Sequence, residues 1–300
     1  MVVTPQMADR VVSRYWPLHE QALVNEDLML LADLSAGSAR RWEINAVACD
    51  CFTVSAVRPL LEAVYFVPRQ LSYPARFIAQ VRTRYSNGKE GVELLTFSRS
   101  GPLAPFRVIE SSFFGPQEGK PARLILPDTT ADGFTKPVSP AVRARARSVA
   151  RQFAAVWQET KNTGRIPASA EAFVLQGQTG NRLADLAEHR QDTKQKNGLY
   201  GHFTFFTTKA DPLVVVPSAH DFVLACQPVH GNIEYTPGRG SSVYQDPGLA
   251  NWGPLVKAGR YRAITLYQEW QTCFVIYEDP AKKVAVFNQD IGGGVFKPRR

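Results

Sequence analysis

The first half of the chain opens with apolar residues at helical spacing. They fall on one face of a helix that we expect over residues 7–34: Val11, Tyr15, Leu18 and Ala22. Thr4 can cap this helix, and Pro5 suits its first position because the missing amide hydrogen is not needed there. Pro17 should kink or divide the helix.

The hydrophobic pattern then changes to the alternation that is typical of strands. Residues 42–54 are rich in β-formers without a clean period and indicate a helix-to-sheet transition. Alternation over residues 77–83, a turn at Asn87-Gly88 and a return run over residues 92–97 predict a β-hairpin. Residues 106–110 supply a third strand, so the first half ends in an antiparallel meander.

A proline-rich segment separates the two halves. Residues 116–140 hold five prolines and two glycines, the composition of a linker or an extended crossing segment. We therefore expect a first domain over 1–125, a linker over 126–138 and a second domain over 139–300. Ser139-Pro140 starts the second domain as Thr4-Pro5 starts the first, with apolar residues again on one helical face: Val142, Val149, Phe153 and Val156.

The rest of the second half alternates in the manner of strands after a short helical stretch at residues 182–191. The predicted strands are 199–207, 213–216, 221–230, 261–270, 272–278 and 284–289. The predicted fold class is α+β, with two tandem cystatin-like units that each pack a long helix on a curved antiparallel sheet. The halves share a pattern but little residue identity, so two unrelated α+β domains stay an alternative.

Composition and charge narrow the class of protein. An apolar content of 44% with 21% charged residues is that of a folded globular protein. No apolar run approaches the roughly 18 to 20 residues that a spanning helix needs. The net charge of +8 permits attraction to nucleic acid, anionic lipid or an acidic wall polymer without choosing among them. Residues 1–5 lack the features of a secretory signal, so the protein is cytoplasmic or its targeting segment has been removed.

Four short stretches resemble an uncharacterised family of actinomycete cell-envelope proteins. They are VVTP at residues 2–5, YFVPRQ at 65–70, YPARF at 73–77 and PFRV at 105–108. The resemblance implies a lipoprotein signal or membrane anchor followed by two cystatin-like or nuclear-transport-factor-like α+β units. It implies an extracytoplasmic ectodomain, joined to the membrane only through an anchor that this chain lacks, and it carries over no catalytic residue.

The four cysteines are too few for a disulfide scaffold in a chain of this size. Cys49 and Cys51 would sit about 6.5 to 7 Å apart on one strand face, which favours buried structural thiols over a disulfide with another partner or a metal or redox role. Cys226 and Cys273 lie in predicted strands of the same half, where neighbouring strands could bring them to bridging distance. Either a disulfide or two free thiols fits the sequence, and an extracytoplasmic location would favour the disulfide.

Motifs for common chemistries are missing from the sequence. The five histidines lack the short paired spacings of zinc sites, and neither a Gly-x-Ser-x-Gly elbow nor a phosphate-binding loop with lysine occurs. We therefore expect neither a metal nor a cofactor. His220-Asp221 could act as an acid–base pair in a pocket lined by Phe205, Tyr267 and Trp270, although exposed or structural roles also fit.

Three arginines recur every four residues in the second predicted helix. Arg143, Arg147 and Arg151 form a positive stripe that could contact an anionic partner or simply face solvent.

These observations favour a non-enzymatic, extracytoplasmic binding or scaffolding module of the cell envelope, with a protein or cell-wall partner at the sheet surfaces or the linker groove. The alternative is a small-molecule isomerase or dehydratase, or a ligand carrier, that uses the cup of one domain. A nucleic-acid binder ranks last because basic residues are scattered over both halves, so no specific nucleic acid is expected. A cytoplasmic location is the alternative compartment, and the sequence does not indicate an oligomeric state.

Overall fold

The structure is a computed structural model of the 300-residue chain. It describes residues 2–48, 56–114, 124–175, 183–184, 187, 199–207, 214–237, 243–245, 259–261, 263–289 and 295–299. The fold is α+β, with antiparallel and mixed sheets. Within the described residues, no helix combines the length and the apolarity that a membrane crossing requires.

The N-terminal part begins with three helices. They are α1 (Pro5–Val24), α2 (Leu28–Leu34) and α3 (Gly37–Ala48). The Thr4 hydroxyl accepts a hydrogen bond from the Met7 amide at 3.2 Å, as the predicted cap requires. Asp27 caps α2 in the same way, accepting from the Leu30 amide at 3.0 Å.

Two expectations for this helical region are wrong: one helix over residues 7–34, which is α1 and α2 with residues 25–27 between them, and a transition to sheet that begins at residue 42. Of the two effects expected of Pro17, division does not occur, because Ser13 and Pro17 lie on the exposed side of α1 where the carbonyl freed by proline can bond water. Residues 42–48 belong to α3 and do not begin a sheet. Buried Glu43 and half-buried Val47 lie one helical turn apart, so packing on one face overrides the β-propensity of this stretch.

Four antiparallel strands complete the N-terminal part in the order β1-β2-β3-β4. They are β1 (Leu60–Phe66), β2 (Ala75–Arg84), β3 (Glu90–Arg99) and β4 (Arg107–Phe114). The predicted hairpin and third strand are confirmed, with Phe77 opposite Phe97 across β2 and β3. Gly88 takes a φ of 77° in the hairpin turn, a conformation that the Asn-Gly sequence favours.

The linker is bonded to both parts of the molecule over residues 124–138. The Thr135 amide donates to the Val67 carbonyl of the first part at 2.9 Å, and the Asp128 amide donates to the Pro217 carbonyl of the second at 3.1 Å. Bridges pair Pro68 with Thr135 and Pro127 with Ser218. This described stretch of the linker is therefore a fixed connection between the two sheets.

The C-terminal part begins with the long helix α4 (Pro140–Thr163), which Ser139 caps by accepting from the Val142 amide at 3.3 Å. A seven-stranded sheet follows, in which β5, β12, β11, β8 and β6 are neighbours, β13 pairs with β11, and β7 pairs with β8. The strands are β5 (Phe173–Leu175), β6 (Leu199–Thr207), β7 (Val214–Pro217), β8 (Phe222–Pro237), β11 (Ala263–Tyr277), β12 (Val284–Gln289) and β13 (Val295–Arg299).

The predicted strands of this part are confirmed with one main correction. Residues 261–270 and 272–278 were expected as two strands, but β11 is continuous from Ala263 to Tyr277 because Gln271 between them forms no turn. A turn at η1 (Ala168–Ala172) and the short pair β9 (Val243–Gln245) and β10 (Gly259–Tyr261) complete the described elements. The predicted helical stretch at 182–191 lies almost wholly outside the described residues.

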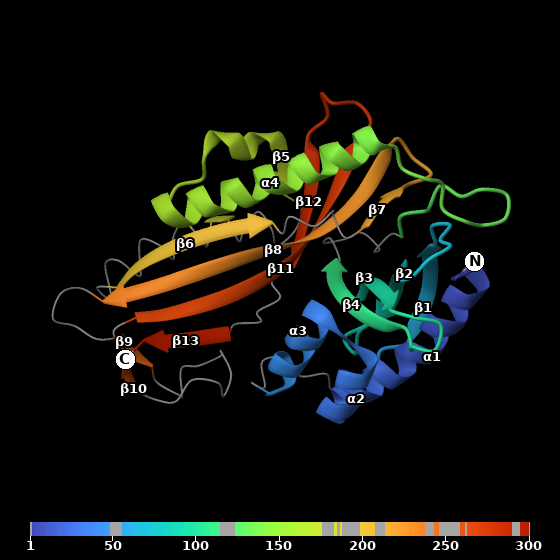
Figure 1. The fold of residues 1–300 in the computed structure, drawn as a ribbon, viewed down its shortest axis with the longest axis horizontal. Coiled ribbons are helices and arrows are strands. Elements are labelled where there is room, and N and C mark those ends of the chain that lie inside the picture. The colour runs from blue at the N-terminus through green and yellow to red at the C-terminus, as the bar shows by residue number, and fades with distance from the viewer. Residues whose placement is uncertain are drawn as a thin grey trace.

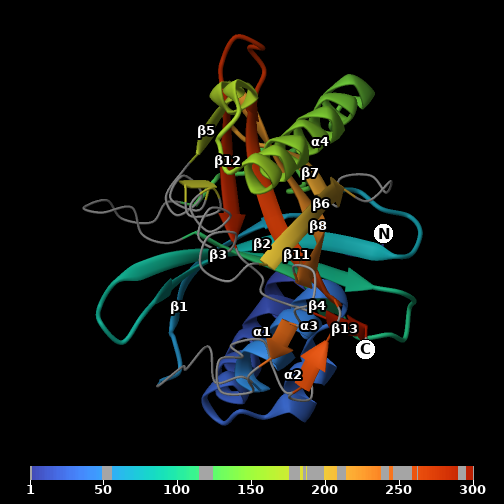
Figure 2. The ribbon, with the colours of Figure 1, turned by 90° about the vertical axis from the view of Figure 1, so that its left-hand side faces the viewer.

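The two sheets face one another, with helices on their outer sides. Figure 1 shows α1, α2 and α3 beside the first sheet and α4 across the second, and in Figure 2 the strands β2 and β3 cross β8 and β11 steeply. A shared core joins the sheets, with Phe66, Ile78 and Leu94 from the first against Leu224 and Val275 from the second. The parts therefore bury apolar surface against each other, as crossed sheets do.

Each helix–sheet space is also filled by side chains among the described residues. Tyr15, Trp16, Phe77 and Phe97 belong to the core between the first helices and their sheet. Phe153 of α4 contacts Phe274 of β11 edge to face, with ring centroids 5.7 Å apart.

Candidate functional site

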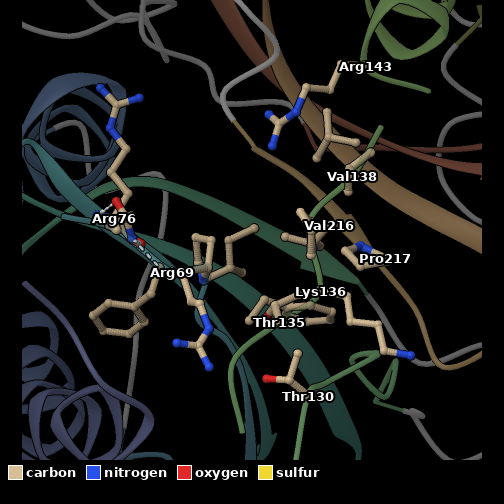
Figure 3. A pocket seen from close by; sticks show the side chains of 16 residues that line it. Arg69, Arg76, Thr130, Thr135, Lys136, Val138, Arg143, Val216 and Pro217 are labelled. Atoms are coloured by element: carbon tan, nitrogen blue, oxygen red, sulfur yellow. Dashed lines mark hydrogen bonds between the residues drawn. The ribbon is translucent and has the colours of Figure 1, made fainter. Parts of the chain in front are cut away.

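A groove of about 390 Å³ lies where the two sheets and the linker meet. We call it the junction groove. Its walls come from the end of β1 and the start of β2, from linker residues 130–138, from β7 and from the first turn of α4 (Figure 3). Its apolar lining side chains are Phe66, Phe77, Ile78, Val138, Val215 and Val216. A concave apolar site with a few polar groups at its edge is the usual form of a ligand pocket.

Four basic side chains line the same groove: Arg69, Arg76, Lys136 and Arg143. Two of them already have acidic partners. Arg69 pairs with Asp132 and stacks over the Phe134 ring at 4.8 Å, and the Lys136 ammonium lies 2.8 Å from the Asp128 carboxylate.

Arg76 and Arg143 have no such partner within the described part of the chain. The Arg76 Nε is buried and makes no hydrogen bond to a described residue, although an unpaired buried donor costs free energy. Arg143 is exposed in the first turns of α4, where a cation meets the positive end of the helix dipole and no acidic residue offsets it. In Figure 3 Arg76 lies on the β2 side of the groove and Arg143 on the α4 side. The groove therefore holds positive charge that the described residues leave uncompensated.

The predicted arginine stripe divides between two surroundings. Arg143, Arg147 and Arg151 all lie exposed on α4, as helical spacing requires. Arg143 lines the junction groove, whereas the groove lining does not include Arg147 or Arg151. The stripe therefore contributes Arg143 to the candidate site, while Arg147 and Arg151 lie on the exposed surface of α4 outside the groove lining.

The structure joins Cys226 and Cys273 by a disulfide, as one of the two interpretations of the sequence expects. The two residues face each other in the register of β8 and β11, with Cα atoms 4.1 Å apart. Both side chains are buried in the core between the two sheets. Val214 of β7 pairs with Cys226, so the disulfide begins on the strand next to the one that forms one wall of the groove.

The predicted acid–base pair is not formed. Asp221 lies on an exposed turn and binds Lys282, with its carboxylate 2.6 Å from the ammonium, while His220 stacks on the Phe222 ring at 5.9 Å. The lysine hydrogen bond, followed by its charge, lowers the pKa of Asp221. An exposed carboxylate takes the nearest flexible ammonium as its partner, so His220 and Asp221 do not meet in a pocket.

The other residues named from the sequence lie outside the described side chains. Phe205 sits in β6, and Tyr267 and Trp270 sit in β11, where the backbone pairing alone is described. Cys49 and Cys51 fall in the stretch 49–55, outside the described residues.

A second charged site lies deep in the N-terminal part. Arg58, just before β1, is 6% exposed, and Glu20 of α1 is fully buried. The Arg58 guanidinium donates to both carboxylate oxygens of Glu20 at 2.6 and 2.8 Å, and to Glu93 of β3 at 2.5 Å. The Trp16 indole donates to the Arg58 carbonyl at 2.8 Å, which fixes the loop against α1. These contacts tie helix, loop and sheet together through one buried cation.

His19 extends this network toward α3. Its Nε2 lies 3.0 Å from Glu43 Oε1, and its Nδ1 lies 3.4 Å from Glu20 Oε1 without making a hydrogen bond. The Tyr15 hydroxyl also has no hydrogen-bond partner among the described residues, and its ring stacks on His19 at 5.0 Å. The cluster of His19, Glu20, Glu43, Arg58 and Glu93 is enclosed, because each side chain in it is buried.

The pKa values of His19 and Glu20 favour the charged forms of these two residues. Burial alone would lower the pKa of His19, but the negative charge of Glu43 and the neighbouring carboxylate of Glu20 raise it to about 9. Burial would raise the pKa of Glu20, but the contacts with His19 and Arg58 lower it to about 2. His19 and Glu20 are therefore both charged at neutral pH.

We expect His19 to make the free energy of unfolding depend on pH. A pKa raised in the folded state stabilises the protein fully below the unfolded value of about 6.5, and this contribution is lost as the pH rises from about 6.5 to about 9. The slope reaches up to about 1.4 kcal/mol per pH unit. Urea unfolding of the protein and of His19→Gln across pH 6 to about 9.5 measures it. The two curves should converge as the pH rises, and a gap that stays constant or widens would contradict the assignment.

Sequence reasoning missed this cluster, although one signal for it was present. Tyr15 and His19 are one helical turn apart on the apolar face of α1, which places an ionisable ring on a buried stripe. Nothing in the sequence around Arg58 indicated its role, because it lies in a loop and contacts Glu20 and Glu93 only in the folded protein.

Among the residues that the structure describes, no three His, Cys, Asp or Glu side chains are placed to hold a metal ion. No protein-family model, curated protein or solved structure matches the chain. A proposal for the function of the protein therefore rests on the geometry of its structure.

Proposed function

We propose that the protein is a non-enzymatic binding module of the cell envelope, and that the junction groove is its binding site. The observation that carries this proposal is the pairing of an apolar wall with two guanidinium groups, of Arg76 and Arg143, that have no partner in the described part of the chain. Such a site fits an anionic group carried by a cell-wall or protein partner, because arginine binds carboxylates and phosphates in a planar, two-pronged manner.

Two further features support the proposal. The Cys226–Cys273 disulfide favours an extracytoplasmic location, since structural disulfides persist mainly in oxidising compartments. The order of helix followed by a mainly antiparallel sheet in both parts supports two tandem cystatin-like units, in line with the resemblance to actinomycete envelope proteins.

An isomerase or dehydratase that uses the cup of one unit has less support. The described space between helix and sheet is filled by aromatic side chains in both parts. The buried pair of His19 and Glu43 has the hydrogen bond of an acid–base pair, yet both side chains are enclosed and a substrate would have to displace the packing above them.

Sedimentation with purified cell walls tests the proposed function. We expect the protein to sediment with the walls and Arg143→Glu to bind about tenfold more weakly or worse, because charge-assisted hydrogen bonds contribute about 1.5–3 kcal/mol. Arg151→Glu is the matched control, since it makes the same charge change on the exposed surface of the same helix, outside the groove lining. Failure of the unmodified protein to sediment, or equal loss in both variants, would contradict the proposal.

A further inference from the structure

We infer, on the basis of the proposed function, that the junction groove takes a single-chain amphiphilic anion, an unbranched alkyl or acyl chain ending in a carboxylate or a phosphate. The chain would lie along the apolar wall and the head group would meet Arg76 and Arg143.

The apolar wall of the groove is the surface that would bind the alkyl or acyl chain of the ligand. Phe66, Ile78 and Val216 belong to the core between the sheets and also line the groove, so the floor of the groove is the packed edge of that core. A volume of about 390 Å³ lies in the lower part of the range for small-molecule pockets. This size and lining suit one aliphatic chain, whose burial in such a surface is favourable for each methylene group.

The two guanidinium groups account for the anionic head. Arg69 and Lys136 are engaged with Asp132 and Asp128, so the charge available to a ligand comes from Arg76 and Arg143. An anion between them would meet both guanidinium groups and would offset the cation at the start of α4.

The backbone around the groove argues against an extended peptide as the occupant. A peptide that adds a strand needs free backbone groups at a sheet edge. Here the linker already uses the Val67 carbonyl through Thr135, at 2.9 Å, and the Pro217 carbonyl through Asp128, at 3.1 Å. A ligand in the groove would therefore be recognised by the lining side chains and the apolar wall. An amphiphile suits this kind of recognition, because it needs no backbone hydrogen bonds.

Calorimetric titration with four probes tests the inference: decanoate, decyl phosphate, decanol and acetate, each below its micellar concentration. We expect decanoate and decyl phosphate to bind at least tenfold more tightly than decanol, and acetate to bind far more weakly than either. Shortening the chain from decanoate to octanoate should weaken binding by about fourfold for each methylene removed. The two anions are compared because their ratio tells a carboxylate-selective site from a phosphate-selective one, both of which the inference includes.

Two substitutions locate the binding. Arg143→Gln should weaken decanoate binding about tenfold or more while leaving decanol binding unchanged, and the matched Arg151→Gln should change neither. Arg76→Gln tests the opposite wall in the same way, and it should also weaken decanoate binding. Thermal unfolding shows whether this variant folds.

The outcomes separate this inference from the proposed function. Equal affinity for decanol and decanoate, an unchanged affinity in both Arg143→Gln and Arg76→Gln, or no binding of any chain-bearing probe would overturn the amphiphilic anion. Wall sedimentation that still depends on Arg143 would then leave the proposed function standing. Decanoate binding as expected, together with wall sedimentation that does not occur, would overturn the envelope partner and keep the ligand class.

Discussion

Replacing Arg58 by methionine is expected to lower the free energy of unfolding by about 3–5 kcal/mol. The guanidinium supplies the hydrogen bonds that compensate the fully buried Glu20 and the nearly buried Glu93. Methionine keeps much of the side-chain length but leaves Glu93 without this cation and Glu20 with His19 alone. Carboxylates that lose their partner in an enclosed site are costly because desolvation penalises the ionised form. Urea denaturation at pH 7 measures the effect.

Arg82→Met is the matched control for this prediction. Arg82 lies in the same sheet and contacts Glu62 at 2.9 Å and Glu90 at 3.4 Å, but its side chain is 30% exposed. Partly exposed pairs contribute about 0–1 kcal/mol, so this variant should change stability little. Adding Glu20→Gln and Glu93→Gln to Arg58→Met should recover part of the loss, because the removed charges no longer need a partner. An Arg58→Met protein as stable as Arg82→Met would show that the cluster is not the tie between α1, the loop and the sheet.

Removing the disulfide with Cys226→Ala and Cys273→Ala together is expected to lower the free energy of unfolding by about 4 kcal/mol. The bond closes a loop with a sequence separation of 47 residues, and the chain-entropy relation gives about this value for such a loop. Alanine is chosen because a serine hydroxyl at either buried position would have to find a partner in the core between the sheets. Denaturant unfolding of the oxidised protein, the reduced protein and the double variant measures the effect.

The reduced protein serves as the control for side-chain loss. It keeps both sulfur atoms, so it should lose nearly as much stability as the double variant if the covalent loop is the cause. Reduction without effect on the unfolding midpoint, together with a large loss in the double variant, would assign the stability to packing of the sulfur atoms between the sheets and not to the bond.

Local chemistry made much of the fold predictable. Thr4 and Ser139 each cap a helix as expected, and Asn87-Gly88 makes the turn of the β2–β3 hairpin. These features depend on residues close in sequence, so periodicity and turn chemistry suffice to find them. The errors arose where tertiary packing decided the outcome, as for Glu43 and Val47, which hold a β-rich stretch in the helix α3.

The candidate site was much less predictable than the fold. The junction groove draws on residues near Phe66, near Thr135 and near Val216, three segments that the chain order keeps far apart. Of its basic residues, sequence reasoning named Arg143 alone, because helical spacing placed that residue in a stripe. Arg76 resembled an ordinary polar position of a strand, and the absence of an acidic partner for it is visible only once the described residues are folded.

The account centres on the claim that the junction groove is where the ligand lies. Photo-crosslinking tests this most directly, using a decanoate analogue with a diazirine at the end of its chain and mass spectrometry to find the labelled residues. We predict labels on the apolar wall, within residues 66–78, 130–138 and 215–217, and a strong reduction of these labels in Arg143→Gln but not in Arg151→Gln. Labels concentrated on the outer surface of α4 around Arg147 and Arg151, or spread evenly over the protein, would contradict the claim.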